Sequence, residues 1–137
     1  MDSFGVFNVS ASALEAQRSR MNLIASNMAN VHSTRTQGGG PYRRKDVVFS
    51  VTQDESNPVK GLEGVKVAEV IEDKSEPVIV YDPGHPDANK DGYVAMPNIN
   101  VTEEMVNMMM ATRAYEASVA AFNMSKAMFI KSLDIGR

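Results

Sequence analysis

The 137-residue sequence contains no cysteine and no tryptophan, and only two histidines. The absence of cysteine excludes disulfides, iron–sulfur clusters, thiolate zinc sites and cysteine nucleophiles. No window approaches the 18 consecutive apolar residues that a membrane-spanning helix needs, so no direct membrane insertion is expected. The net charge of −3 and the pI of about 5.4 argue against nucleic acid as a partner, because phosphate binding requires accumulated Lys and Arg. The remaining composition, 43% apolar and 23% charged, is typical of a single domain that folds in water.

The N-terminal segment also lacks the pattern of a cleavable signal peptide. Residues 1–45 carry six basic and two acidic side chains, but Asp2 is acidic, and polar residues such as Asn8 and Ser10 interrupt the early apolar positions. No apolar region of the required length therefore precedes the small residues Ala11-Ser12-Ala13. If the protein leaves the cytoplasm, we expect export without a cleaved signal.

A seven-residue repeat predicts a first helix over residues 8–31. The repeat consists of Phe7, Leu14, Met21 and Met28, with Ile24 and Val31 at the companion positions. Ser10 and Gln17 stand where apolar companions are expected, so the apolar stripe is weak at its beginning. Gly38-Gly39-Gly40-Pro41 ends any helix.

The C-terminal segment predicts a longer helix. Asn100-Val101-Thr102-Glu103 has the pattern of a capping box, and neither Pro nor Gly occurs between Asn100 and Gly136. Apolar residues repeat every seven positions, small residues take the alternate position, and further apolar residues lie four positions after members of the series. These three sets are Val101, Met108, Tyr115, Phe122 and Phe129; Ala111, Ser118, Ser125 and Ser132; and Met105, Val119 and Leu133. We expect one helix of about 34 residues and about 50 Å.

The length of this predicted helix exceeds the diameter of a compact protein of 137 residues, which is roughly 35–40 Å. Six of the ten methionines lie in residues 105–128, and Met108-Met109-Met110 places apolar side chains on three sides of one turn. Two interpretations are open: methionines fill an irregular core between two helices, or a second apolar face meets other subunits.

Residues 42–97 predict a small β-rich region. Three β-branched stretches, at residues 47–51, 64–71 and 77–81, are separated by Gly, Pro, Asn and charged clusters. We expect three short strands in one small sheet. A sheet with so few large apolar side chains buries little surface by itself. It is therefore expected to pack against the helices or against a neighbouring subunit.

The segment from Asp82 to Tyr93 contains the most suggestive chemical motif. Asp87-x-Asn89-x-Asp91-Gly92 matches the start of an EF-hand calcium loop, but the twelfth position is Asn98 instead of Glu. Three interpretations are open: a tight acidic turn held by Asx hydrogen bonds, a metal-binding module, and a hydrolase using His85 and Asp87. The turn is favoured.

Gly38-Gly39-Gly40 followed by Arg43-Arg44-Lys45 lacks the Gly-Lys-Ser/Thr ending of a phosphate-binding loop. This segment instead indicates a hinge and a solvated basic patch. We assign no catalytic, cofactor-binding or metal-ligating residue. No motif in the sequence indicates a cofactor or a small-molecule substrate.

Several segments carry a resemblance to a known family. Residues 24–31, Ile-Ala-Ser-Asn-Met-Ala-Asn-Val, resemble the N-terminal signature of bacterial flagellar axial proteins, the rod, hook and hook-associated family. Further segments resemble the proximal rod proteins of that family: residues 39–45, 81–88, 92–101, 104–105 and 113–117. Residues 30–36 lack the Thr-Pro-Gly-Phe turn of many axial proteins, which suits a proximal rod protein better than a distal rod or hook protein.

The resemblance implies a structural subunit of the basal-body rod, the periplasm-spanning drive shaft that transmits torque for motility. It implies helical assembly with copies of itself and with other rod proteins. It also implies synthesis in the cytoplasm and export through the flagellar type III apparatus without a cleavable signal peptide, and no catalysis.

The expected fold class is α+β, with long terminal helices paired as an antiparallel coiled coil and a small β-rich insertion between them. The expected domains are a discontinuous helical core, residues 1–36 plus 98–137, and a β-rich domain with Gly/Pro loops, residues 37–97. The expected assembly-interface residues are packing positions: Leu14, Met21, Ile24, Met28, Met105, Met108, Tyr115, Val119, Phe122 and Phe129.

Overall fold

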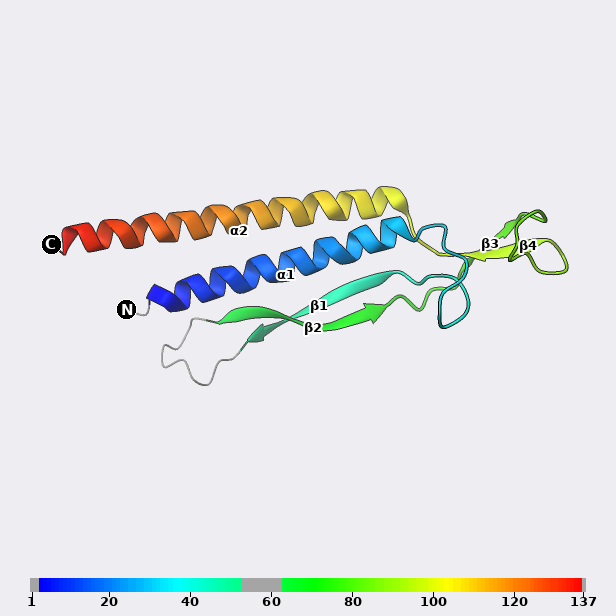
Figure 1. Ribbon diagram of the computed structural model, residues 1–137, viewed down its shortest axis with the longest axis horizontal. Coiled ribbons are helices and arrows are strands. Elements are labelled where there is room, and N and C mark those ends of the chain that lie inside the picture. Colours follow the sequence, from blue (N-terminus) through cyan, green and yellow to red (C-terminus); the bar gives the residue numbers. More distant parts are fainter. Residues whose placement is uncertain (1–2, 53–62, 137) are drawn as a thin grey trace.

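The computed structural model describes residues 3–52 and 63–136, and it has the α+β architecture of two long terminal helices with a small β insertion between them (Figure 1). The elements in chain order are α1 (Ser3–Ala29), β1 (Lys45–Thr52), β2 (Gly64–Glu72), β3 (Val78–Tyr81), β4 (Tyr93–Met96) and α2 (Val101–Ile135).

Helix α2 confirms the predicted uninterrupted C-terminal helix, with 35 residues. Its N-cap is Asn100, whose side-chain oxygen accepts hydrogen bonds from the backbone N–H groups of Thr102 (3.0 Å) and Glu103 (3.4 Å). These bonds satisfy two amides that have no partner inside the helix. Glu103 and Glu104 place negative charge in the first turn, where the helix dipole favours it.

Helix α1 begins at Ser3, earlier than the predicted residue 8, and ends at Ala29, two residues before the predicted end. The early start agrees with the packing of Phe7 on α2, which the weak apolar stripe did not predict. The end is marked by Asn30, whose side-chain amide donates to the Ser26 carbonyl (2.9 Å) and whose amide oxygen accepts from Ser33 Oγ (3.0 Å). These local bonds compete with further helical turns.

The two helices lie side by side and run in opposite directions (Figure 1). The Phe7 ring, near the start of α1, lies 5.3 Å from the Phe122 ring and 6.1 Å from the Phe129 ring, both in edge-to-face geometry. At the other end, Asn27 donates a hydrogen bond to Glu104 in the first turn of α2.

The β region has four described strands in two separate antiparallel pairs, so the predicted single three-stranded sheet is wrong. β1 pairs with β2, and β3 pairs with β4, the strand that was not predicted. The turn between β3 and β4 explains the second pair. Gly92 adopts a φ of +81°, and an added Cβ there would lie 2.9 Å from Tyr81 Cε2, so the chain reverses closely enough for Tyr81 and Tyr93 to pack.

The β1–β2 pair packs along α1, and α1 therefore lies between this pair and α2, whereas β3–β4 extends beyond the ends of the helices (Figure 1). Ser12 Oγ on α1 accepts a hydrogen bond from the Val65 backbone N–H (3.0 Å) and joins the two layers. The expectation that the β region leans on the helices is thus confirmed for β1–β2.

The core of the described residues is small. Apart from Gly and Pro, its buried apolar residues are Ala16, Ile24, Val94 and Ala111. Of the two described helices, neither combines the length and hydropathy that crossing a membrane requires.

Candidate functional site

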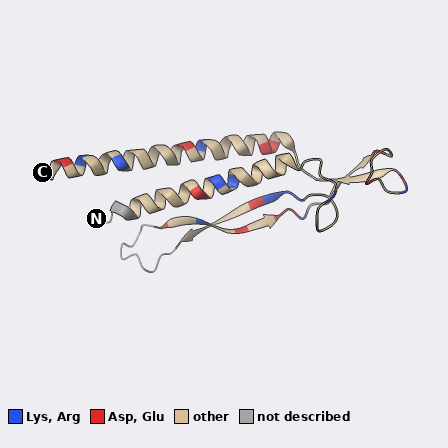
Figure 2. Ribbon diagram, viewed as in Figure 1, with Lys and Arg blue, Asp and Glu red and all other residues tan. Residues whose placement is uncertain are grey.

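The side of α2 that does not face α1 exposes many large apolar side chains. Between residues 105 and 130 the helix carries only three charged side chains, Arg113, Glu116 and Lys126. Most of α2 is accordingly tan in Figure 2, the colour of residues other than Lys, Arg, Asp and Glu. Seven large apolar side chains of this stretch are between 45% and 64% exposed: Met105, Val106, Met109, Met110, Met124, Met128 and Ile130. We call these seven residues the α2 outer face. An apolar surface of this extent is typical of a protein–protein contact.

The opposite side of α2 is the seam with α1. Buried or half-buried positions here recur at alternating intervals of four and three residues: Glu104, Met108, Ala111, Tyr115, Ser118, Phe122, Ser125 and Phe129. Ala111 is fully buried at 0% exposure. Small residues at alternate seam positions leave room for α1.

The ten predicted assembly residues fall into two groups. Nine are buried or half-buried: Leu14, Met21, Ile24, Met28, Met108, Tyr115, Val119, Phe122 and Phe129. Met105 is 53% exposed and belongs to the α2 outer face. Leu14 and Tyr115 line one groove between the two helices, and Phe122 and Phe129 contact Phe7. The role of all ten in contacts with other subunits stays a prediction.

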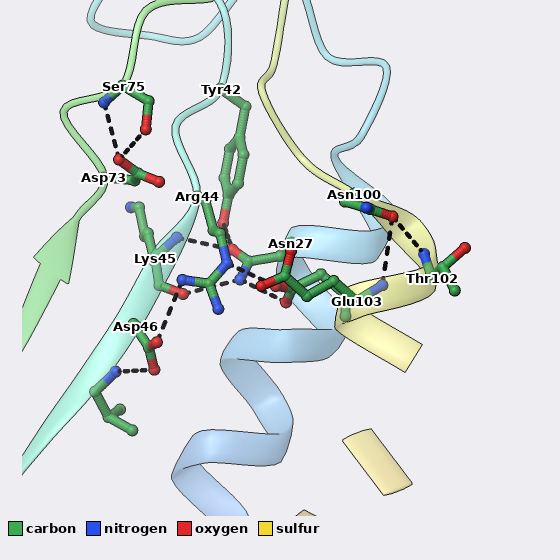
Figure 3. Close-up of polar contacts among 12 residues, drawn as sticks. Asn27, Tyr42, Arg44, Lys45, Asp46, Asp73, Ser75, Asn100, Thr102 and Glu103 are labelled. Atoms are coloured by element: carbon green, nitrogen blue, oxygen red, sulfur yellow. Dashed lines mark hydrogen bonds and ion pairs between the residues drawn. The ribbon is translucent and has the colours of Figure 1, made fainter. Parts of the chain in front are cut away.

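A buried polar cluster joins α1, α2 and β1 where the end of α1 meets the start of α2 (Figure 3). We call Asn27, Tyr42, Arg44, Lys45 and Glu104 the polar cluster. Asn27 and Glu104 are 0% and 1% exposed. Buried polar groups are costly unless their hydrogen bonds are made, so their partners decide whether the cluster stabilises the fold.

Asn27 makes four side-chain hydrogen bonds. Its Nδ2 donates to the Lys45 carbonyl (2.8 Å) and to Glu104 Oε2 (3.0 Å). Its Oδ1 accepts from the Lys45 N–H (2.9 Å) and from the Tyr42 hydroxyl (3.1 Å). The amide thus binds both backbone groups of the first β1 residue, as a neighbouring strand would, and ties β1 to both helices.

Glu104 also forms an ion pair with Arg44. Arg44 Nε lies 2.6 Å from Glu104 Oε1, and Arg44 Nη1 lies 3.2 Å from Asp46 Oδ2. Burial by itself lowers the pKa of Arg44, but the hydrogen bond and negative charge of Glu104, with those of Asp46, raise this pKa above its ordinary value. The guanidinium therefore stays charged and holds the Glu104 carboxylate in place.

The ion pair corrects the interpretation of residues 43–45 as a solvated basic patch for Arg44, whereas Arg43 is exposed. Arg44 is engaged within the polar cluster, and Lys45 Nζ pairs with Glu72 (3.4 Å). The preceding glycines form a hydrogen-bonded turn, in which Gly39 N–H donates to the Thr36 carbonyl (3.0 Å).

A polar groove of about 510 Å³ lies beside the polar cluster. Its lining consists of carboxylates, guanidinium groups, amides and one aliphatic side chain: Arg20, Ile24, Arg44, Asp46, Asp73, Asn98, Asn100, Glu103, Glu104 and Asn107. Within this lining Arg44 forms ion pairs with Asp46 and Glu104, so these three charged groups are engaged with one another.

The segment between β3 and β4 forms a tight turn held by side-chain hydrogen bonds. Asn89 Oδ1 accepts from the N–H groups of Asp91 (3.0 Å) and Tyr93 (2.9 Å). The Asp87 carboxylate accepts from Thr34 Oγ1 (2.8 Å) and pairs with Arg35 (3.3 Å). These oxygens are engaged within the chain, and no group of three potential metal-ligating side chains occurs in residues 3–52 and 63–136.

His85 does not form an acid–base pair with the Asp87 carboxylate. Its Nδ1 accepts a hydrogen bond from the Asp87 backbone N–H (3.0 Å), so the ring completes the turn. The arrangement therefore has no base directed at a nucleophile, which a hydrolase requires.

Sequence reasoning did not identify the polar cluster. Its members lie in segments that carry the family resemblance: Asn27 in residues 24–31, Tyr42 to Lys45 in residues 39–45, and Glu104 in residues 104–105. No local pattern marks them as a cluster, because their contacts join segments that are far apart in the sequence.

Comparison with known proteins adds independent findings. Residues 7–35 match the family model described as flagella basal body rod protein, and residues 90–135 match the model described as the C-terminal region of flagellar basal body rod FlgEFG proteins. The chain is 44% identical over 137 residues to the flagellar basal-body rod protein FlgC of Salmonella typhimurium, covering all of both chains. It is 43% identical over 150 aligned positions to FlgC of Bacillus subtilis, again covering all of both chains. It is 42% identical to FlgC of Borreliella burgdorferi, covering 98% of each chain.

Proposed function

Because the chain belongs to the FlgC family of flagellar basal-body rod proteins and is a structural subunit of the rod, not an enzyme, we propose that it assembles mainly through the α2 outer face. In this proposal the exposed apolar side chains of α2 are covered by helices of neighbouring rod subunits. The exposure of these side chains in the single chain is the observation that carries the proposal.

The total surface supports the same proposal. The chain exposes 9887 Å², whereas a compact protein of 15.0 kDa exposes roughly 7000 Å². The excess reflects an elongated molecule with a small core. Contacts with other chains would complete that core and supply the burial that the single chain lacks.

The helix pair is proposed to act as an antiparallel coiled coil. The alternating intervals of four and three along the α2 seam are the spacing of such a seam. Residues 1–36 plus 98–137 would form the helical core of the assembly, and residues 37–97 its β-rich part. The buried or half-buried predicted residues, such as Leu14 and Phe122, keep the pair rigid, while Met105 on the outer face is positioned for direct contact with a neighbour.

The proposed partners are copies of this chain and other rod proteins. The α2 outer face and the β regions are different surfaces. A heterologous contact, in which one surface of a subunit binds a different surface of the next, can repeat without closing into a ring. Repetition of such contacts builds an open helical tube, the geometry needed for a periplasm-spanning shaft that transmits torque.

We further propose that the subunit is made in the cytoplasm and exported by the flagellar type III apparatus without a cleavable signal peptide. The support is the similarity of the whole chain to FlgC proteins, which are named as flagellar basal-body rod proteins.

The test replaces Met124, which is 64% exposed, by Asp or by Leu in cells that lack the native gene. Leu preserves apolar volume and is expected to support motility. Asp places a charge on the covered face and is expected to abolish motility and to yield basal bodies without a complete rod, because burial of an unpaired charge is strongly unfavourable. Circular dichroism of both purified variants controls for folding. Normal motility of a folded Met124→Asp variant would contradict the proposed contact.

A further inference from the structure

The methionines of α2 differ sharply in their exposure. Met105, Met109, Met110, Met124 and Met128 are 53%, 59%, 59%, 64% and 61% exposed. We call these five residues the exposed methionines.

Met108 lies next to Met109 in the sequence but is half-buried in the seam with α1. The helix thus carries two classes of thioether, one open to solvent and one covered by α1. The second class provides an internal reference on the same helix.

An exposed methionine thioether is chemically reactive toward peroxides. The sulfur attacks the terminal peroxide oxygen, a sulfur–oxygen bond forms, and the oxygen–oxygen bond breaks. With hydrogen peroxide the products are methionine sulfoxide and one water molecule, so the sulfur is oxidised by two electrons and the peroxide is reduced by two. The reaction turns an adaptable apolar side chain into a polar one with a strong hydrogen-bond acceptor.

We propose that the exposed methionines are oxidation sites of the unassembled subunit, and that their conversion to sulfoxides by peroxides prevents incorporation into the rod. This inference rests on the proposed function, in which the α2 outer face is covered on assembly. Assembly then removes the same side chains from solvent and protects them. The α2 outer face thereby admits intact subunits to the rod and excludes oxidised ones.

The arrangement of the five residues explains why oxidation would act on assembly. Met105 and Met109, and likewise Met124 and Met128, are four residues apart and so lie one above the other on the helix surface. Five alanines lie between the two pairs, and residues 105–130 have only three charged side chains. A sulfoxide buried there finds few donors on its own helix, so the loss of its hydration is not compensated.

The first measurement is the site-resolved oxidation rate of the purified full-length subunit in dilute hydrogen peroxide. Trypsin cleavage after Lys90, Arg113, Lys126 and Lys131 separates Met124 and Met128 onto their own peptides, and fragment ions resolve the methionines before Arg113. The exposed methionines are expected to oxidise roughly fivefold faster than Met108, in line with their greater exposure. Equal rates at Met108 and Met109 would overturn the inference.

The second measurement repeats the oxidation on isolated basal bodies. The exposed methionines are expected to react at least about tenfold more slowly than in the free subunit. Unchanged rates would overturn both this inference and the proposed function. Protection in basal bodies combined with normal incorporation of an oxidised subunit would overturn this inference alone and leave the proposed function standing.

Incorporation is measured in cells without methionine sulfoxide reductase activity. The cells receive a peroxide pulse when the subunit has been synthesised but has not yet been assembled into rods. Cells with the native sequence are expected to lose motility, whereas cells in which all five exposed methionines are replaced by Leu are expected to retain it. Equal sensitivity of the two strains would overturn the inference.

A second variant keeps the test decisive if the fivefold replacement does not fold. Met109→Gln with Met124→Gln introduces polarity similar to that of the sulfoxide and needs no peroxide. This variant is expected to reduce rod incorporation severalfold relative to Met109→Leu with Met124→Leu. Equal incorporation of the two double variants would overturn the inference.

Discussion

Replacement of Asn27 by Ala tests whether the polar cluster fixes the junction of α1, α2 and β1. Asn27 is fully buried, and its side chain makes four hydrogen bonds of 2.8 to 3.1 Å. The truncation leaves both backbone groups of Lys45 and one oxygen of Glu104 without these partners. The Tyr42 hydroxyl keeps its contact with Ser26 Oγ at 3.3 Å.

The magnitude can be worked from these contacts. Each buried group that loses its partner costs about 1–3 kcal/mol, and Ala gains about 0.5 kcal/mol over Asn in helix propensity. Lys45 is only half-buried, so water reaches part of the vacated site and reduces the loss. We expect Asn27→Ala to lower the free energy of unfolding by about 2–4 kcal/mol, a large share of the roughly 5–15 kcal/mol typical of a domain.

The assay is urea unfolding of the purified chain monitored by circular dichroism at the helix band, with linear extrapolation to water. The matched control is Asn22→Ala, an exposed asparagine on the same helix, which is expected to change stability by at most about 0.5 kcal/mol. An Asn27→Ala change as small as that of the control would refute the reasoning that the cluster stabilises the junction.

Three further predictions concern other parts of the molecule. Gly92→Ala is expected to destabilise the chain by about 1–3 kcal/mol in urea unfolding, because the φ of this residue is +81° and the new Cβ would lie 2.9 Å from Tyr81 Cε2. The control is Gly38→Ala, whose new Cβ meets nothing within 4 Å. Equal effects of the two substitutions would contradict the prediction. Hydrogen bonds from the Ser75 hydroxyl and N–H lower the pKa of Asp73. These bonds therefore stabilise the fold at pH values above the ordinary carboxyl pKa, and this stabilisation is lost as the pH falls through the lowered pKa of the folded state. Ser75→Ala should raise the pKa of Asp73 in an NMR titration, and an unchanged pKa would contradict the assignment. Phe122→Asp is expected to abolish rod assembly while export continues, because it places a charge against an α1 phenylalanine; normal motility of that variant would count against the seam assignment.

The long C-terminal helix was predictable because its signals are local. Asn100 supplies a cap, the apolar repeat continues for several heptads, and no helix breaker intervenes before Gly136. The helix therefore forms where the pattern places it. The start of α1 was less predictable, because the packing of Phe7 on two rings of α2 outweighs the weak local pattern.

The polar cluster was not predictable from local pattern. Asn27 and Glu104 are 77 positions apart, and each has an ordinary local role, one as a polar residue in a helix and the other as an acidic residue in a first turn. Only the opposite directions of α1 and α2 bring them together at 3.0 Å. The sequence segments around Asn27 and Glu104 therefore resemble the family but do not reveal the contact between these two residues.

The arrangement of strands was predicted only in part. The stretches at 47–51 and 64–71 lie in strands, as do residues 78–81 of the third stretch, because β-branched residues are frequent in them. The partner of the third stretch, β4, has only four residues, and its pairing depends on the backbone conformation of Gly92. Such a short strand has too little periodicity to predict, so the division into two sheets emerged only from the structure.

The most direct test of the central claim is an electron-microscopic density of an intact rod in which this chain is traced. The account predicts that Met109, Met110 and Met124 on the α2 outer face pack against helices of neighbouring subunits. It also predicts that α1 and α2 remain paired along their seam. A rod density in which the α2 outer face contacts only solvent, with the subunits joined through other surfaces, would contradict the account.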